Sequence, residues 1–264
     1  MIKIENIQVV GFEPAIRGMR NPMNSWEKSD SIFAEVGRDD VHDLIGNHVG
    51  FGPLSDVGDD IGPNDHDLMI RLAKQGSVHG KFRRMIVAYM DITAPLYWWK
   101  EFDTYKVGTV ANSCSTMHKI HSKEFTLDDF SHEHLFGFFN EEDHDCWTVD
   151  INSISDLESA DILDLTINML NKARALYLEY QKKAGSGNEF AKAHVKEYWW
   201  QMIQLLPSSY NQRRTVMVSY EVLANICQYR GTHKLDEWRE FCRVIDDLPY
   251  SEIITCGLGD EDDT

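Results

Sequence analysis

The order of apolar and polar positions predicts strands near the start of the chain. Residues 1–10, MIKIENIQVV, alternate with the period of two that marks a half-buried strand. A β-like apolar run in residues 81–93, KFRRMIVAYMDIT, predicts a central strand. Between them, residues 65–76 place apolar side chains near helical spacing, with Asp65 or Asp67 as the expected N-cap.

Helical spacing dominates the second half of the chain. A broad apolar stripe over residues 156–183 predicts one helix of about seven turns. After a short Gly-Ser-Gly turn, Asn188 is the expected N-cap of a helix that Pro207 stops. Two further helices are expected near residues 212–230 and 234–247.

These elements predict an α+β fold, in which a mixed or antiparallel sheet from the N-terminal half is covered by a helical C-terminal half. No internal repeat or long linker divides the chain, so we expect a single domain over residues 1–258. Residues 36–66, rich in Gly, Asp and His, are expected to be mostly loop of undefined structure. The acidic end GDEDDT, residues 259–264, predicts a solvated, disordered tail.

Composition limits the classes of function. The 264 residues are 42% hydrophobic, which is typical of a globular protein with a core. The N-terminus lacks the features of a signal peptide, no apolar run approaches the roughly 20 residues of a membrane span, and five scattered cysteines favour a reducing cytoplasm. A net charge of −17 argues against general nucleic-acid binding, but it is compatible with one pocket for a small anionic ligand.

Histidines cluster in SHEHLFGFFNEEDHDCW, where His132, His134, His144 and Cys146 could converge on a metal ion. Their spacing matches no established zinc signature. We therefore assign no metal site, and whether these four residues bind metal stays open.

The other histidines and cysteines favour structural roles. His118 and His121 lie one helical turn apart without an evident third ligand, so we expect them to be partly buried. Cys114 lacks an evident activating base and is expected to be a buried structural cysteine, and Cys227 and Cys242 are expected in the core.

Cationic pairs are scarce in so acidic a chain. Arg83 and Arg84 fall in the predicted central strand, while Arg213 and Arg214 are expected to open a helix, whose N-terminus would favour an anion. The chain has no dinucleotide-binding glycine motif, no P-loop and no nucleophile elbow.

Residues 97–120, YWWKEFDTYKVGTVANSCSTMHKI, resemble the signature segment of the flavin-dependent thymidylate synthases (ThyX). Asn112 falls on the asparagine of that signature and Ser115 on its second serine. The other signature positions differ, and they hold Tyr105, Lys106, Val107, Val110, Ser113, Met117 and His118.

Residues 205–241 resemble the C-terminal pattern of the same family. Asn225 falls on a flavin-contacting asparagine, Arg230 on an arginine that faces the substrate base, and His233 lies near a family histidine. Glu221 stands in place of an arginine. Residues 72–95 resemble the family's helix and strand before the signature, without its Glu-His pair.

The resemblance implies a ThyX-like fold, a homo-oligomer, expected to be a tetramer, with sites between subunits, and FAD as the cofactor. It places the cofactor contacts at Asn112, Asn225, Arg230 and His233. The substrate contacts are expected at Lys106, Ser113, Ser115, Arg213 and Arg214, and no catalytic residue is assigned.

The missing arginines remove the bidentate phosphate clamp of the family. We therefore expect a protein that binds a nucleotide or flavin-type ligand without the standard methylation of dUMP. One alternative is an altered flavin enzyme that transfers a one-carbon unit to another pyrimidine nucleotide. The second is a non-catalytic nucleotide-binding or scaffold protein.

Overall fold

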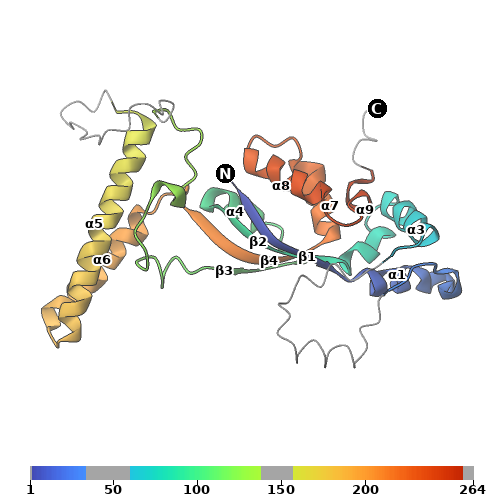
Figure 1. The fold of residues 1–264 in the computed structure, drawn as a ribbon, viewed down its shortest axis with the longest axis horizontal. Helices are drawn as coiled ribbons and strands as arrows, with labels where there is room; N and C mark the ends of the chain where they lie inside the picture. Colours follow the sequence, from blue (N-terminus) through green and yellow to red (C-terminus); the bar gives the residue numbers. More distant parts are fainter. Residues whose placement is uncertain (1, 34–59, 138–156, 258–264) are drawn as a thin grey trace, which may run out of the picture. The chain divides into compact units, whose positions relative to one another are not determined.

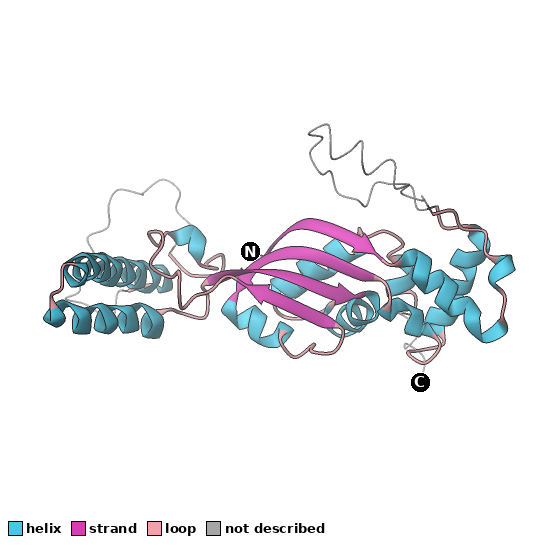
Figure 2. Ribbon diagram, turned by 90° about the horizontal axis from the view of Figure 1, so that it is seen from below, coloured by secondary structure: helices cyan, strands magenta, loops and turns pink. Residues whose placement is uncertain are grey.

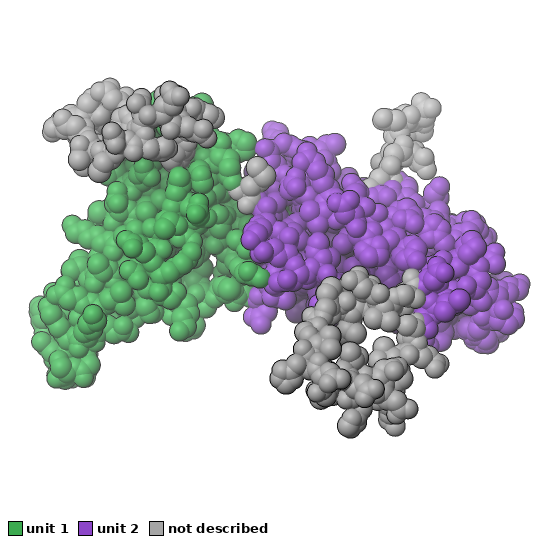
Figure 3. Space-filling model, viewed as in Figure 1, with its two compact units in different colours: residues 1, 93–101, 113–213 green, residues 2–92, 102–112, 214–264 purple. Residues whose placement is uncertain are grey.

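The computed structural model describes residues 2–33, 60–137 and 157–257. Two compact units make up the chain (Figure 3). The helical unit comprises residues 1, 93–101 and 113–213, and the sheet unit comprises residues 2–92, 102–112 and 214–264. The single domain expected over residues 1–258 stays a prediction, and the acidic tail and most of residues 36–66 lie outside the described ranges.

The sheet has the strand order β1-β2-β4-β3 (Figures 1 and 2). Its strands are β1 (Lys3–Val10), β2 (Val87–Pro95), β3 (Thr109–Ser113) and β4 (Asn211–Ser219). The amide of Tyr220 donates to the carbonyl of Ile86 at one end of β2, and the amide of Leu96 donates to the carbonyl of Tyr210 at the other. The central pair is therefore antiparallel, and the predicted α+β class is confirmed.

Alternation along the strands gives the sheet one apolar and one polar face. On β2, Met90 and Ile92 are buried, whereas Asp91 between them lies on the opposite face. There the Asp91 carboxylate accepts hydrogen bonds from Asn6 Nδ2 at 2.8 Å and from Thr215 Oγ1 at 2.5 Å. One side chain thus ties β1, β2 and β4 together across the polar face.

Helices of the sheet unit supply the rest of its core. They are α1 (Phe12–Arg20), α3 (Pro63–Lys74), α7 (Tyr220–Arg230), α8 (Asp236–Asp246) and α9 (Glu252–Thr255), with the 3-10 turns η1 (Asn21–Met23), η2 (Trp26–Lys28) and η4 (Gly80–Arg84). In Figure 1, α7 and α8 lie on the same side of the sheet. Phe102, at the end of α4 (Leu96–Phe102), stacks on Trp238 of α8 with ring centroids 6.3 Å apart.

The start of α3 differs from the prediction. Its N-cap is Gly62, and the carboxylate of Asp30 accepts hydrogen bonds from the first amides, those of Asn64 at 2.9 Å and Asp65 at 3.0 Å. Asp65 is fully buried and pairs with Arg20 at 2.6 Å. Asp65 therefore stabilises the interior. The first amides of α3 are instead satisfied by the side chain of Asp30, which lies 34 positions before Asn64.

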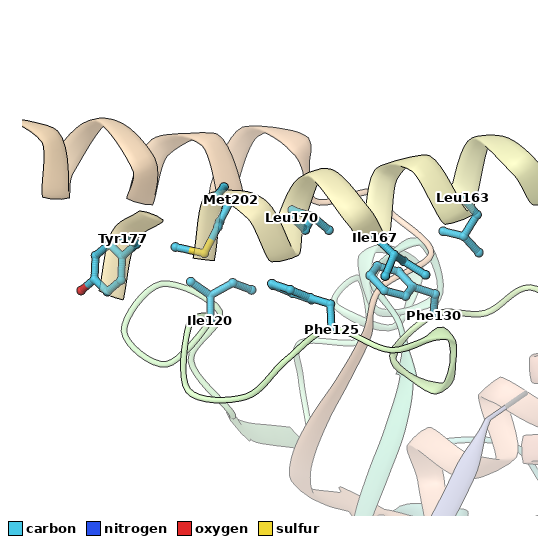
Figure 4. Packing of buried hydrophobic residues seen from close by; sticks show 9 residues of the cluster. Ile120, Phe125, Phe130, Leu163, Ile167, Leu170, Tyr177 and Met202 are labelled. Carbon is cyan, nitrogen blue, oxygen red and sulfur yellow. The ribbon is translucent and has the colours of Figure 1, made fainter. Parts of the chain in front are cut away.

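In the helical unit, α5 (Ser159–Gly185) and α6 (Glu189–Leu205) form a hairpin. The expected cap is confirmed, because Asn188 Oδ1 accepts a hydrogen bond from the amide of Ala191 at 3.2 Å. Segment 113–131, which includes η5 (Leu127–Asp129), lays Ile120, Phe125 and Phe130 against α5. Figure 4 shows these side chains beside buried residues of both helices.

Three local predictions were wrong. The predicted helix near 212–230 begins only at Tyr220, because the β-branched run before it forms β4. The strand expected over 81–93 begins at Val87, after η4. Cys114 is exposed, whereas Cys227 and Cys242 are buried as expected.

Among the described helices, none combines the length and apolar character needed to cross a membrane.

Candidate functional site

One candidate site lies in the sheet unit beside α7, and we call it the α7 pocket. Its cavity has a volume of about 640 Å³, within the usual range for a small-molecule site. It is bounded by α7, α9, the C-terminal end of α3 and η4. The lining residues are Ala73, Lys74, Gly76, Ser77, Arg83, Val107, Glu221, Val222, Ala224, Asn225, Gln228, Ile254, Cys256 and Gly257.

Arg83 is the most unusual side chain of the α7 pocket. It is only 7% exposed, and its Nη1 donates to the carbonyl of Ile253 at 3.3 Å. Among the described residues, its buried Nε has no hydrogen-bond partner. Burial lowers the pKa of Arg83, although the neighbouring Cys256 and Glu221 favour its charged form. The desolvated guanidinium of Arg83 thus borders the cavity and makes one hydrogen bond among the described residues.

Glu221, on the rim of the same pocket, is neutralised from another element. The Arg84 guanidinium donates to both carboxylate oxygens, from Nη2 to Oε1 at 3.0 Å and from Nε to Oε2. This bidentate geometry is the strongest that an arginine makes with a carboxylate. Glu221 therefore does not oppose an anion in the pocket as an unpaired carboxylate would.

Two amide side chains and one lysine complete the α7 pocket. Asn225 and Gln228 are exposed on α7 and line the cavity, and Lys74 is exposed at the end of α3. Asn225 is the one predicted cofactor residue that lines this pocket.

A second, smaller cavity of about 270 Å³ in the sheet unit contains two predicted substrate residues, Lys106 and Arg214. We call it the Arg214 pocket. Arg214 Nη1 pairs with Asp103 Oδ1 at 2.6 Å, so its charge is already compensated. The hydroxyl of Thr109, also in the lining, is buried without a hydrogen-bond partner.

Arg230 and His233 are held in contacts with aromatic and backbone groups. Arg230 Nε donates to the hydroxyl of Tyr105 at 3.1 Å, and its guanidinium lies 5.0 Å from the ring centroid of Trp238. The Nδ1 atom of His233 accepts a hydrogen bond from the amide of Leu235 at 3.2 Å. Both residues therefore contribute to packing around α8.

Arg213 and Arg214 do not act together, which corrects the expected helix N-terminus. They are neighbours in β4, and successive strand residues point to opposite faces. Arg213 lines a cavity of about 230 Å³ in the helical unit, together with Ser115 and Cys114. The Ser115 hydroxyl accepts a hydrogen bond from the amide of His118 at 3.0 Å, which closes a local turn.

The two remaining predicted residues, Asn112 and Ser113, are exposed at the end of β3. Neither lines any of the three cavities described above. The nine predicted contacts therefore do not line one common cavity.

In the described part of the chain, no group of three or more His, Cys, Asp or Glu side chains is placed to hold a metal ion. His132 Nδ1 lies 2.8 Å from the carbonyl oxygen of Phe130. His144 and Cys146 fall outside the described residues, so their metal binding is untested.

Sequence reasoning missed Lys74, Gln228 and Cys256, and it placed Arg83 in a strand. The Arg83-Arg84 pair is a usable signal, since adjacent cationic pairs are scarce in a chain with 43 acidic residues. Its division into one buried and one ion-paired residue depends on contacts with α7 and α9 that no local pattern encodes.

No protein-family model and no curated protein sequence matches the chain. Solved structures do match over almost its whole length. A crystal structure of ThyX from Helicobacter pylori with FAD and dUMP aligns with a TM-score of 0.57 and 14% identity, covering 98% of this chain and 100% of that one. A second Helicobacter pylori ThyX structure, also complexed with FAD and dUMP, aligns with a TM-score of 0.54 and 15% identity, covering 97% and 99%. At such identity the likeness establishes the fold.

Proposed function

We propose that this protein is a diverged ThyX-like protein that binds a nucleotide or flavin-type ligand and does not carry out the standard methylation of dUMP. The observation that carries the proposal is the shared α+β fold, which covers nearly all of this chain and of ThyX structures that hold FAD and dUMP. The partial match of residues 97–120 and 205–241 to the ThyX patterns points to the same relationship.

The α7 pocket is the proposed ligand site. It contains Asn225, which falls on a flavin-contacting asparagine of the family pattern, and its volume suits a small organic ligand. The buried Arg83 with its unpartnered Nε, together with Lys74, suits the anionic part of FAD or a nucleotide. FAD is therefore the proposed cofactor, and it would supply the redox chemistry of a flavin.

The proposed loss of dUMP methylation follows from the predicted substrate residues. The arginine positions of the signature hold Tyr105, Val107 and Met117, which cannot clamp a phosphate. Arg214, a potential replacement, pairs with Asp103, and Arg230 packs on Trp238. Binding of the family's substrate phosphate at its usual place is thus not supported by these side chains.

The proposal includes a homo-oligomer, with a tetramer as the form that the resemblance implies. The nine predicted contacts do not share one cavity, and this agrees with sites completed between subunits. An altered one-carbon transfer enzyme and a non-catalytic nucleotide-binding scaffold remain the two alternatives, and both retain the ligand site.

Thermal unfolding with a panel of ligands tests the proposal. A ligand that binds only the native state raises its stability, by about 2.7 kcal/mol at a concentration of 100 times Kd. We expect FAD, FMN or a pyrimidine nucleotide to raise the Tm, while the amino acids and sugars used as controls leave it unchanged. A Tm that no flavin or nucleotide raises would contradict the proposal.

A further inference from the structure

We propose that Arg83 and Lys74 form an anion site in the α7 pocket that holds the phosphate groups of the ligand. The inference rests on the proposed function, because it assigns the charged part of the same ligand. Arg83 and Lys74 lie outside the two segments that match the ThyX signature and C-terminal patterns. They belong to residues 72–95, which lack the Glu-His pair of the family pattern.

The burial of Arg83 carries the argument. Within the described residues Arg83 makes no ion pair, and its one hydrogen bond reaches a neutral carbonyl, that of Ile253. Placing a charge in the interior without an ion pair costs several kcal/mol. The neighbouring Glu221, which pairs with Arg84, favours the charged form of Arg83, but burial outweighs this effect. Such an arrangement is typical of a binding site, in which the ligand supplies the missing anion.

The surroundings of Arg83 favour an anion over a cation. Lys74 brings a second positive charge to the same lining, and Ser77 adds a hydroxyl. Among the described lining residues, Glu221 is the only carboxylate, and Arg84 neutralises it. The pocket therefore has a positive balance in a chain of net charge −17.

Gly80 packs closely against one edge of the Arg83 guanidinium. A Cβ on Gly80 would lie 3.2 Å from both Nε and Nη2 of Arg83, closer than ordinary contact distance. A larger residue at position 80 would therefore press on the guanidinium.

The test measures binding of inorganic pyrophosphate, ADP and adenosine by calorimetry at low ionic strength. The full chain is compared with Lys74→Gln, with Arg83→Met, and with Lys81→Gln as the matched control. Lys81 is an exposed lysine of η4, the same turn as Arg83, and does not line the pocket. We expect Lys74→Gln to lower the affinity for pyrophosphate and for ADP about threefold to fivefold. Arg83→Met should lower both affinities about tenfold or more, and Lys81→Gln should leave them unchanged.

A purely structural role for Arg83 makes a different prediction. It requires Arg83→Met to unfold more easily, whereas the anion site requires the unliganded variant to be as stable as the parent, or more so, because a buried unpaired charge is removed. If Arg83→Met does not fold, Lys74→Gln alone decides. Equal effects of Lys74→Gln and Lys81→Gln, or no binding of pyrophosphate, overturn the inference.

The combination of ligands and variants distinguishes failure of this inference from failure of the proposed function. Binding of pyrophosphate that depends on Lys74, without binding of FAD or any nucleotide, supports the anion site and contradicts the proposed function. Binding of FAD or ADP that neither variant weakens supports the proposed function and overturns the anion site.

Discussion

Arg84 and Glu221, 137 residues apart in the chain, form a two-point ion pair at the rim of the α7 pocket. Glu221 lies in the first turn of α7, and Arg84 ends the turn η4. The hydrogen bond to Glu221, together with its charge, raises the pKa of Arg84. The pair explains how an acidic residue is compatible with an anionic ligand in this pocket.

Removal of Arg84 is therefore expected to lower the affinity for the ligand, although Arg84 itself does not line the pocket. In Arg84→Ala, the unpaired Glu221 carboxylate should lower the affinity for FAD or ADP about threefold, as expected for an exposed charge. The double variant Arg84→Ala with Glu221→Gln should restore the affinity, as measured by calorimetry. Parental affinity in the single variant would show that Glu221 lies too far from the ligand to matter.

The buried pair of Arg20 and Asp65 should dominate the stability of the sheet unit. Asp65→Ala leaves a buried guanidinium without its partner and is expected to lower the free energy of unfolding by about 3–5 kcal/mol. Asp67→Ala, on the same helix but in an exposed pair with Arg71, should change it by less than about 1 kcal/mol. Urea denaturation measures both, and equal losses would contradict this role.

Asp65 should also contribute to acid sensitivity. Burial alone would raise the pKa of Asp65, but hydrogen bonds from Ser29, Ser31 and Arg20 and from the Asp30 amide outweigh burial and lower it below 3.8. A lowered folded pKa stabilises the native state above the unfolded pKa of about 3.9, and this contribution is lost as the pH falls through the folded value.

Asp65→Asn removes that contribution. Its free energy of unfolding should therefore fall less steeply below about pH 4 than that of the parent. The measurement is urea denaturation across an acid pH series, and parallel curves for Asp65→Asn and the parent would contradict the assignment.

The hairpin of α5 and α6 offers a matched test of its core. Leu170 is fully buried against the segment shown in Figure 4, whereas its neighbour Met169 is 50% exposed. Leu170→Ala should destabilise the helical unit by about 3 kcal/mol, and Met169→Ala by less than about 0.5 kcal/mol. Thermal unfolding followed by circular dichroism distinguishes them, and similar losses would place the core elsewhere.

An assay of thymidylate formation tests the proposed change of activity. Purified protein with dUMP, methylenetetrahydrofolate, NADPH and FAD should form no thymidylate at a useful rate, because residues 105–107 lack the arginines of the ThyX signature. An authentic ThyX enzyme assayed in parallel provides the control. Rapid methylation would show that other side chains have replaced the phosphate clamp.

Much of the fold follows from local patterns in the sequence. The strand β1, the helices α5, α6 and α8, and the cap at Asn188 were predicted because periodicity and capping are local properties. β4 differs from the predicted helix because its residues 211–219 run directly into α7, and the β-branched stretch around Val216 favours a strand.

The site was less predictable because it depends on long-range contacts. The two arginines Arg213 and Arg214 look like one anion clamp in sequence, yet the strand sends them to different cavities. The burial of Arg83 and the pairing of Arg84 with Glu221 are set by α9 and α7, which lie at least 137 residues later. In the sequence, only the adjacent pair of arginines marks this segment.

The ultraviolet–visible spectrum of the purified protein tests the central proposal most directly, first without additions and then after incubation with FAD and desalting. We predict a bound chromophore, seen either as a visible flavin band or as nucleotide absorbance in excess of that from 7 tryptophans and 10 tyrosines. A spectrum that tryptophan and tyrosine account for completely, both before and after incubation with FAD, would contradict it.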